Sequence, residues 1–532
     1  MIEWKGVNMD NNLSVIRTDP AEILNDLEKL KNKFSFYLFK SLLSREENEV
    51  EVYGKVLVGN DGAFNQISIM SKFMIQCDLA YFNGTEYHFE LSKTDYHPYF
   101  CEFFIDNTIK INCLKRYIGK WVKMKLTLGK TTKKNGVKGF LLFSASPIIR
   151  VKGELQFNDV CENLTKEEIK EIEEVNSLGN VEEYIKNNYD KINKNEIKKK
   201  FSSLIEKTNS ITGKIYNVGQ GNCIYMRFTK RLEADDKVGD NSDVNVFFDV
   251  GESIKPSVIA DEVNYINLNA HDFSSKDKLP SFIILSHWDL DHILGVSHLS
   301  STIYSNDSND KRTLWIAPNL ALLPKRLQSA SAIRLCCYLV KVKLILLAGD
   351  ANNKSNKNKK SICIIDEKTD LVCLKLWQGE GKNSPNRLNN NIGLFLCISI
   401  TGLKGKRVNP TQRILFAGDC EYRQMHEEIF LDNLKNEVKY DFIVTSHHGS
   451  KNAVFNDKLS RNKSENKECQ CVQGALHSRA VISFGVNGYG HPDAEHIFAL
   501  KRNGFTVVFT PGCQYIEFSV SENKRLKLSN VN

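Results

Sequence analysis

The 532-residue chain lacks any apolar run close to the roughly 18 residues that a membrane-spanning helix needs. The nearest approach, residues 34–43, is interrupted by Lys40. The first residues also lack the basic and then apolar pattern of a secretory signal. We therefore expect no membrane association and predict a cytoplasmic protein.

The chain also has no extreme charge balance and no cysteine framework. Lys and Arg total 72 against 64 Asp and Glu, and a formal net charge of +8 does not by itself indicate a nucleic-acid-binding protein. Its 14 cysteines include two close pairs, Cys336-Cys337 and Cys469-x-Cys471, but neither has the second pair that a zinc finger requires. Reduced thiols in the cytoplasm are the simplest explanation.

Four segments differ in their residue patterns, and the length alone predicts two or three domains. Residues 1–46 form a helical segment, residues 47–158 a β-rich domain, residues 159–210 a charged helical connector, and residues 211–532 an α/β domain. Short strands and Asn-Gly turns predict a small antiparallel, OB-like barrel for the second segment. This barrel would bind a protein partner, an oligomer or single-stranded nucleic acid, unless its aromatic residues all lie in the core.

The α/β segment contains the densest group of candidate ligands. Residues 282–295 read FIILSHWDLDHILG, an apolar strand followed by His287, Asp289, Asp291 and His292. Alternate residues of an extended chain point the same way, so His287 and Asp289 can meet at one point, with the other two at a second point nearby. This pattern predicts a two-metal site, and the alternative is a polar loop with incidental histidines.

Further motifs follow in a fixed order along the chain. They are Asn217 to Asn222 with Phe247 to Gly251, then Leu415 to Asp419, then Ser446-His447-His448-Gly449-Ser450, then Asn487 to Pro492. Together with the HxDxDH segment they resemble the metallo-β-lactamase-fold hydrolase domain of ComEC-type competence proteins, in a soluble stand-alone form. The resemblance covers about residues 211–520. A second Gly-Asp pair ends at Asp350, but the paired histidines follow only Asp419.

The resemblance implies an αββα sandwich with two divalent ions between loops at one sheet edge. His287 and Asp289 would hold the first ion, Asp291 and His292 the second, and Asp419 would bridge them. Either His447 or His448 would complete the second site, and His447 is favoured because it follows the strand more closely. Asp291 and Asp419 are also the expected catalytic residues.

Two departures from the commonest pattern of this fold bear on the metal. Asp289 stands where many members carry a second His, and no His lies between His298 and His426. An oxygen-rich site favours Mn²⁺, with Zn²⁺ or Mg²⁺ as alternatives. Asn222 stands where the family usually has Asp, which would weaken the orientation of a ligand.

Residues after the paired histidines are the candidate substrate contacts. His448, Lys451, Asn487 and Tyr489 would bind substrate, and His491 would bind a phosphate or protonate the leaving oxygen, if it does not only fix the turn before Pro492. Asn389 to Asn391 are given a structural role.

The leading hypothesis is a metal-dependent phosphodiesterase or nuclease acting on nucleic acid, with DNA favoured. The resemblance also places stand-alone members among bacterial antiviral defence effectors. One alternative is a hydrolase of a small phosphodiester, such as a cyclic nucleotide or a phosphocholine ester. The other is a catalytically degenerate scaffold.

Overall fold

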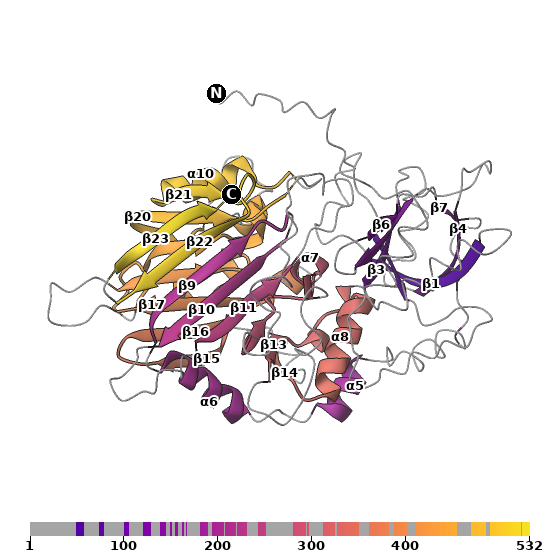
Figure 1. The fold of residues 1–532 in the computed structure, drawn as a ribbon, viewed down its shortest axis with the longest axis horizontal. Coiled ribbons are helices and arrows are strands. Elements are labelled where there is room, and N and C mark those ends of the chain that lie inside the picture. Colours follow the sequence, from indigo (N-terminus) through magenta and orange to yellow (C-terminus); the bar gives the residue numbers. More distant parts are fainter. Residues whose placement is uncertain are drawn as a thin grey trace, which may run out of the picture.

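The computed structural model describes the backbone of eight strands between residues 49 and 163 and most of the chain after residue 180 (Figure 1). Several predicted features therefore lie outside the described residues, namely the helical segment at residues 1–46, Asp350, Asn487 and Tyr489. The described ranges after the eight strands are 166, 181–189, 194–206, 208–219, 221–230, 243–251, 280–293, 295–296, 312–324, 327–349, 361–381, 388–401, 411–432, 434–454, 470–485, 490–522 and 524–531.

The eight strands of the β-rich segment form one sheet. Its order is β6-β5-β3-β2-β1-β4-β7, with β8 paired to β4, and each pairing described there is antiparallel. Closure into a barrel stays a prediction. The strands are β1 (Glu49–Leu57), β2 (Met74–Asp78), β3 (Phe100–Ile105), β4 (Trp121–Leu128), β5 (Gly139–Ser144), β6 (Ile149–Val151), β7 (Leu155–Phe157) and β8 (Glu162–Asn163).

A second sheet of eight strands, here called sheet I, begins the α/β part of the chain (Figure 1). Its order is β14-β13-β12-β11-β10-β9-β22-β23, in which β11 to β14 are parallel and the rest antiparallel. The strands are β9 (Thr208–Tyr216), β10 (Cys223–Lys230), β11 (Val244–Val250), β12 (Phe282–Ile284), β13 (Leu314–Pro318), β14 (Ile345–Ala348), β22 (Tyr515–Ser521) and β23 (Lys524–Val531).

A third sheet, here called sheet II, repeats the same division. Strands β15 to β18 are antiparallel and β18 to β21 are parallel, in sequence order across the sheet. The strands are β15 (Ile362–Lys368), β16 (Val372–Gln378), β17 (Leu394–Ile400), β18 (Gln412–Phe416), β19 (Lys439–Val444), β20 (Gln473–Ile482) and β21 (Thr506–Phe509).

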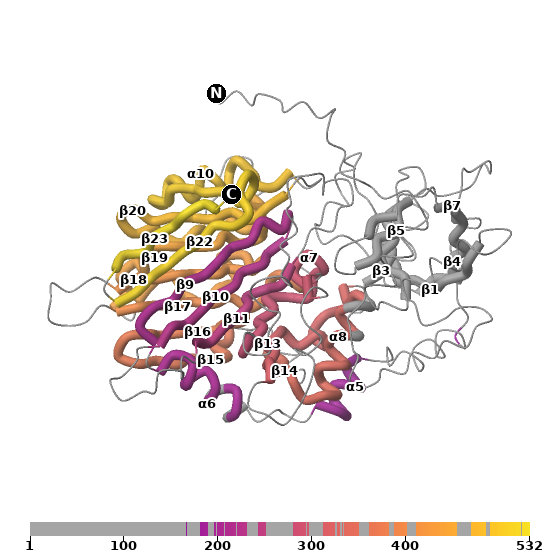
Figure 2. The backbone as a smooth tube through the Cα atoms, viewed as in Figure 1, coloured from indigo at the N-terminus to yellow at the C-terminus, as the bar shows by residue number. Residues whose placement is uncertain are grey.

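Sheets I and II pack face to face through large apolar side chains. The ring centroids of Phe248 in β11 and Phe416 in β18 lie 5.9 Å apart, and Phe518 in β22 lies 5.2 Å from Phe442 in β19. These rings are buried, because alternate residues of each strand point into the space between the sheets. The two layers overlap in Figure 2, where β9 to β11 cross the strands of sheet II. The chain therefore has a mixed α/β architecture with two facing sheets.

Helices pack around the edges of these layers (Figure 1). Helices α5 (Val181–Asn188) and α6 (Lys194–Ile205) come from the predicted connector, yet they bury side chains in the main core. The ring centroids of Phe201 in α6 and Phe282 in β12 lie 4.2 Å apart. Whether a domain boundary falls at residue 210 stays a prediction. Helices α8 (Ala330–Lys341) and α10 (Ala494–Arg502) lie near β14 and β21 respectively. Within the described part of the chain, we find no helix long and apolar enough to cross a membrane.

The direction of the parallel strands fixes where chemistry can occur. Strands β11 and β12 of sheet I, and β18 to β20 of sheet II, end beside one another. The carboxyl ends of parallel strands are the usual position of ligand sites, because loops from neighbouring strands meet there. Asp249, the His287 to His292 segment, Asp419 and the paired histidines lie at or after the ends of these strands, whereas Asn217 to Asn222 follow the antiparallel strand β9.

Candidate metal centre

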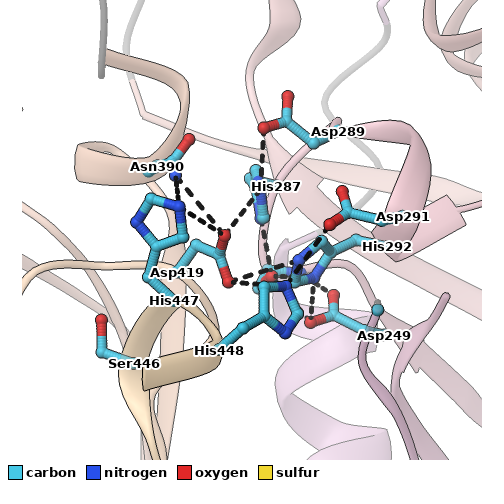
Figure 3. A network of polar contacts seen from close by, with 12 residues as sticks. Asp249, His287, Asp289, Asp291, His292, Asn390, Asp419, Ser446, His447 and His448 are labelled. Atoms are coloured by element: carbon cyan, nitrogen blue, oxygen red, sulfur yellow. Dashed lines mark hydrogen bonds and ion pairs between the residues drawn. The ribbon is translucent and has the colours of Figure 1, made fainter. Parts of the chain in front are cut away.

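The loop after β12 supplies one half of a buried polar cluster (Figure 3). His287 and Asp289 precede the short helix α7 (Leu290–Ile293), which carries Asp291 and His292. His287 and His292 are fully buried, whereas the side chains of Asp289 and Asp291 keep 15% and 14% of their exposed area. The two carboxylates therefore lie between the buried imidazoles and the solvent.

The loops after β18 and β19 supply the other half. Gly418, with φ of 53°, turns the chain so that Asp419 points at the histidines, and an added Cβ at this glycine would lie 2.5 Å from the Cβ of Ser286. His447 and His448 both have positive φ values, which residues other than glycine seldom adopt. Such backbone strain occurs mostly at functional sites, where surrounding contacts hold it.

Asp419 lies between two groups of side chains and presents one carboxylate oxygen to each. Its Oδ1 is 3.3 Å from His292 Nε2 and 3.6 Å from His448 Nε2. His448 Nε2 is in turn 3.4 Å from Asp291 Oδ2. Asp291, His292 and His448 thus form one group with Oδ1 at its edge.

The second oxygen of Asp419 faces a different group. Its Oδ2 is 3.8 Å from His287 Nε2 and 3.7 Å from His447 Nε2. Asp289 Oδ2 lies 3.2 Å from the same nitrogen of His287. The six residues predicted as metal ligands and His448 are therefore all within one cluster, and the two histidines of the HHGS motif lie on opposite sides of Asp419.

Each of three imidazoles has its Nδ1 engaged, so that its Nε2 faces the cluster. His292 Nδ1 lies 2.8 Å from Asp249 Oδ2, His448 Nδ1 donates to the Ser483 carbonyl at 2.9 Å, and His287 Nδ1 lies 2.9 Å from Ser286 Oγ. A proton on Nδ1 leaves a lone pair on Nε2, which is the arrangement of a metal-binding histidine.

The unsatisfied atoms of the cluster fit divalent metal ions. Nε2 of His287, His292 and His448 and Oδ1 of Asp419 are buried and make no hydrogen bond within the described part of the chain. Buried polar atoms without partners are rare in folded proteins. Two atoms that each ligate one ion at about 2.1 Å lie roughly 3 to 3.5 Å apart, which is close to the separations found here.

The charges of the cluster are strongly coupled. Burial alone would raise the pKa of Asp419, but His292, His448 and His447 hold it well below its usual value. Burial would lower the pKa of His292, whereas Asp419, Asp249 and Asp291 raise it well above its usual value. Without an ion, the surrounding carboxylates thus favour the protonated form of His292.

Asp249, at the end of β11, is a functional residue that sequence reasoning treated only as part of a motif. It is fully buried with φ of 58°, and it accepts hydrogen bonds from the backbone N–H and the hydroxyl of Ser286 at 2.6 and 2.7 Å. Because it also holds His292 Nδ1, it fixes the orientation of that ring. The sequence signal was a carboxylate inside the buried strand FFDVG.

Asn222, where the resemblance predicts Asp, acts here through its backbone. Its carbonyl accepts a hydrogen bond from Gly251 N at 2.6 Å, and its own N–H donates to the Asp291 carbonyl at 3.4 Å. An added Cβ at Gly251 would lie 1.9 Å from that carbonyl oxygen. This close packing ties the end of β11 to the loop that carries Asp291.

The remaining predicted residues are placed as follows. The His491 ring lies 5.5 Å from that of His447, Lys451 is exposed in the turn after the paired histidines, and Cys420 is buried next to Asp419. Asn389 and Asn390, from helix α9 (Leu388–Asn391), donate from Nδ2 to Asp289 and to Asp419 respectively. These asparagines thus contact the cluster directly.

Comparisons with known proteins add one structural likeness. No protein-family model and no curated protein matches the chain. A search of solved structures finds "Crystal structure of a long form RNase Z from yeast", at 12% identity and a TM-score of 0.29. The match covers 76% of this chain and 51% of that one, so this chain spans about half of the yeast chain.

Proposed function

We propose that this protein is a metal-dependent phosphodiesterase whose centre holds two divalent ions. The observation that carries the proposal is the position of Asp419, whose Oδ1 lies near His292 and His448 and whose Oδ2 lies near His287 and His447, with His292 within reach of His287 as well. A carboxylate between two such groups is the arrangement expected of a bridging ligand. The two facing sheets, with the centre at the ends of their parallel strands, support the metallo-β-lactamase-type fold that the sequence motifs imply.

The ligands divide between the two ions according to their distances. His287 and Asp289 belong to the first ion, and Asp291 and His292 to the second, with Asp419 between them. We assign His448 rather than His447 to the second ion, because His448 Nε2 is 3.4 Å from Asp291 and its Nδ1 is already held by Ser483. His447 lies instead on the Oδ2 side of Asp419, near the first ion.

The donor set also indicates the metal. Three carboxylates, those of Asp289, Asp291 and Asp419, accompany the imidazoles, and harder oxygen ligands favour Mn²⁺ or Mg²⁺ over Zn²⁺. When bound, two such ions supply Lewis acidity toward a phosphoryl group. The side chains of the protein hold and orient this centre, and His491, beside His447, is placed to exchange a proton with a leaving oxygen.

Nucleic acid is the proposed substrate, with DNA favoured. Hydrolysis of a phosphodiester requires positioning and charge neutralisation rather than a Ser or Cys nucleophile. A centre with two metal ions would supply both. Lys451, exposed after the paired histidines, would contact the backbone of such a polymer. A role in bacterial antiviral defence, a protein partner of the β-rich segment and a cytoplasmic location remain expectations from the sequence.

The test is cleavage of plasmid, linear duplex DNA, single-stranded DNA and RNA, with Mn²⁺, Mg²⁺, Zn²⁺ or EDTA. A small diester, bis(p-nitrophenyl) phosphate, is assayed in parallel. We expect cleavage of DNA with Mn²⁺, none with EDTA, and a loss of at least about a hundredfold in Asp419→Asn and His448→Ala. Asp243→Asn, a distant carboxylate that pairs with Arg227, is the matched control.

The outcomes separate the alternatives. Turnover of the small diester alone would replace the nucleic-acid substrate with a small phosphodiester. Full activity in EDTA, or in Asp419→Asn, would contradict the proposed centre. Failure on every diester, with two ions bound, would favour a scaffold.

A further inference from the structure

Helix α9 reaches the metal centre from a part of the chain that carries no histidine. Its three asparagines, Asn389 to Asn391, are each at most 1% exposed. Buried side-chain amides are costly unless their polar atoms find partners. Yet Oδ1 of Asn389 and Oδ1 of Asn390 make no hydrogen bond within the described part of the chain. Helix α9 therefore carries buried carboxamide oxygens beside the centre.

Asn390 lies beside two atoms of the first ion's group of ligands. Its Nδ2 is 3.4 Å from Asp419 Oδ2 and 3.5 Å from His447 Nε2 (Figure 3). Both hydrogen bonds are long, because N–H···O and N–H···N distances are usually 2.7 to about 3.2 Å. The amide of Asn390 is therefore about as far from Asp419 Oδ2 and from His447 Nε2 as two ligands of one metal ion are from each other.

The chemistry of the carboxamide suits that position. A half turn about the Cβ–Cγ bond exchanges Nδ2 and Oδ1 without moving the rest of the side chain, and the two orientations are chosen by the partner they face. Toward the acceptor Asp419 Oδ2 the amide presents its NH₂ group, and His447 Nε2 accepts from the same group when its ring carries the proton on Nδ1. Toward a cation it would present Oδ1, which is a ligand that Mn²⁺ and Mg²⁺ accept.

The neighbouring Asn389 constrains the same group of ligands. Its Nδ2 donates to Asp289 Oδ1, and the other carboxylate oxygen of Asp289 faces His287 Nε2. Two consecutive residues of one helix thus contact Asp289 and Asp419, which are the two carboxylates assigned to the first ion. The position of α9 is fixed by the backbone hydrogen bonds of Gly379 to Gly393 and of Gly381 to Asn391.

We infer that Asn390 is a ligand of the first ion, supplied by a stretch of the chain, His298 to His426, that has no histidine between its ends. This inference rests on the proposed two-ion centre and extends it, because it assigns a ligand role to a residue for which the sequence predicts only a structural role. The first site would then contain the imidazole of His287, the carboxylates of Asp289 and Asp419, and the carboxamide oxygen of Asn390. His447 lies beside them. The second site, with Asp291, His292 and His448, would not depend on Asn390.

The test measures metal binding rather than turnover. Mn²⁺ is titrated into metal-free protein and followed by calorimetry and by the electron paramagnetic resonance signal of free Mn²⁺. We expect two ions in the unaltered protein, and in Asn390→Ala a loss of at least about tenfold in affinity for one ion only. Asn390→Asp, which keeps the shape and supplies a carboxylate oxygen, should bind both ions at least as tightly as the unaltered protein.

Asn391→Ala is the matched control, because it removes a buried amide one residue along the same helix. It should bind two ions as the unaltered protein does, and thermal unfolding in EDTA compares the folding of all the variants. Two ions bound at unaltered affinity in Asn390→Ala would overturn the inference and leave the two-ion centre standing. No ion bound by the unaltered protein would overturn both. If Asn390→Ala does not fold, weaker Mn²⁺ binding by Asn390→Asp overturns the inference instead.

Discussion

At the scale of single residues, three histidines of the centre have their Nδ1 atom engaged by a neighbouring group, while their Nε2 atom faces the centre. His292 is held by Asp249, His448 by the Ser483 carbonyl and His287 by Ser286. Such contacts fix the ring tautomer and reduce the freedom that metal binding would otherwise have to remove. The ligand positions are thus set by partners that are themselves buried.

Asp249→Asn tests this second layer of contacts. An amide holds His292 less strongly than a carboxylate, so the affinity for the second ion should fall by about ten- to a hundredfold. Calorimetric titration of Mn²⁺ into metal-free protein measures the change. Asp243→Asn, the same substitution in the pair with Arg227, should leave the affinity unchanged. Equal affinities in both variants would show that Asp249 does not orient the ligand.

Metal affinity should depend on pH through His292. Despite its burial, Asp419, Asp249 and Asp291 raise the pKa of His292 well above its usual value, which favours the protonated ring in metal-free protein. An ion must displace that proton, and its apparent affinity should therefore fall by about tenfold for each pH unit below the raised pKa. Titrations in buffers of different ionisation enthalpy measure the protons released. An affinity that does not change between pH 8 and pH 6 would contradict this.

At the scale of elements, the sequence predicts which segments supply ligands better than it predicts how they meet. The apolar strand before His287 and the strand before Asp419 are β12 and β18, as their residue patterns indicate. Both are short apolar runs followed by turns, and this local signal does not depend on tertiary context.

The structural features that the sequence did not predict all depend on contacts between distant segments. The position of α9 against Asp419, the contact of Asp249 with His292, and the placement of the two adjacent histidines on opposite sides of Asp419 are examples. The positive φ values of His447 and His448 separate those two rings, and no residue preference signals them. Likewise, the residue pattern of the charged connector does not indicate that Phe201 packs against Phe282.

Gly251→Ala tests how the β11 end and the Asp291 loop are joined. The added methyl group would lie 1.9 Å from the Asp291 carbonyl oxygen, so the backbone must shift, at a cost of about 3 kcal/mol in the free energy of unfolding. Urea unfolding measures it, and affinity for the second ion should fall as well. Gly512→Ala, with φ of 87° and open space around it, should lose only about 1 kcal/mol. Equal losses would contradict the packing argument.

At the scale of the whole molecule, two sheets of similar construction face each other. Each combines antiparallel strands with a parallel group, and the parallel groups end at the same edge. Sheet I contributes His287 to His292 and sheet II contributes Asp419, His447 and His448. Because the halves of the centre come from different sheets, the apolar core between the sheets, with Phe248 against Phe416, sets the distance between them.

In the proposed centre one carboxylate bridges two ions, and low-temperature electron paramagnetic resonance of Mn²⁺-loaded protein measures whether the two ions are coupled. Two Mn²⁺ ions about 3.5 to 4 Å apart are magnetically coupled and give a spectrum unlike that of isolated ions. We predict a coupled spectrum in the unaltered protein and its loss in Asp419→Asn. Two isolated ions in the unaltered protein, or a coupled pair that persists in Asp419→Asn, would contradict the account.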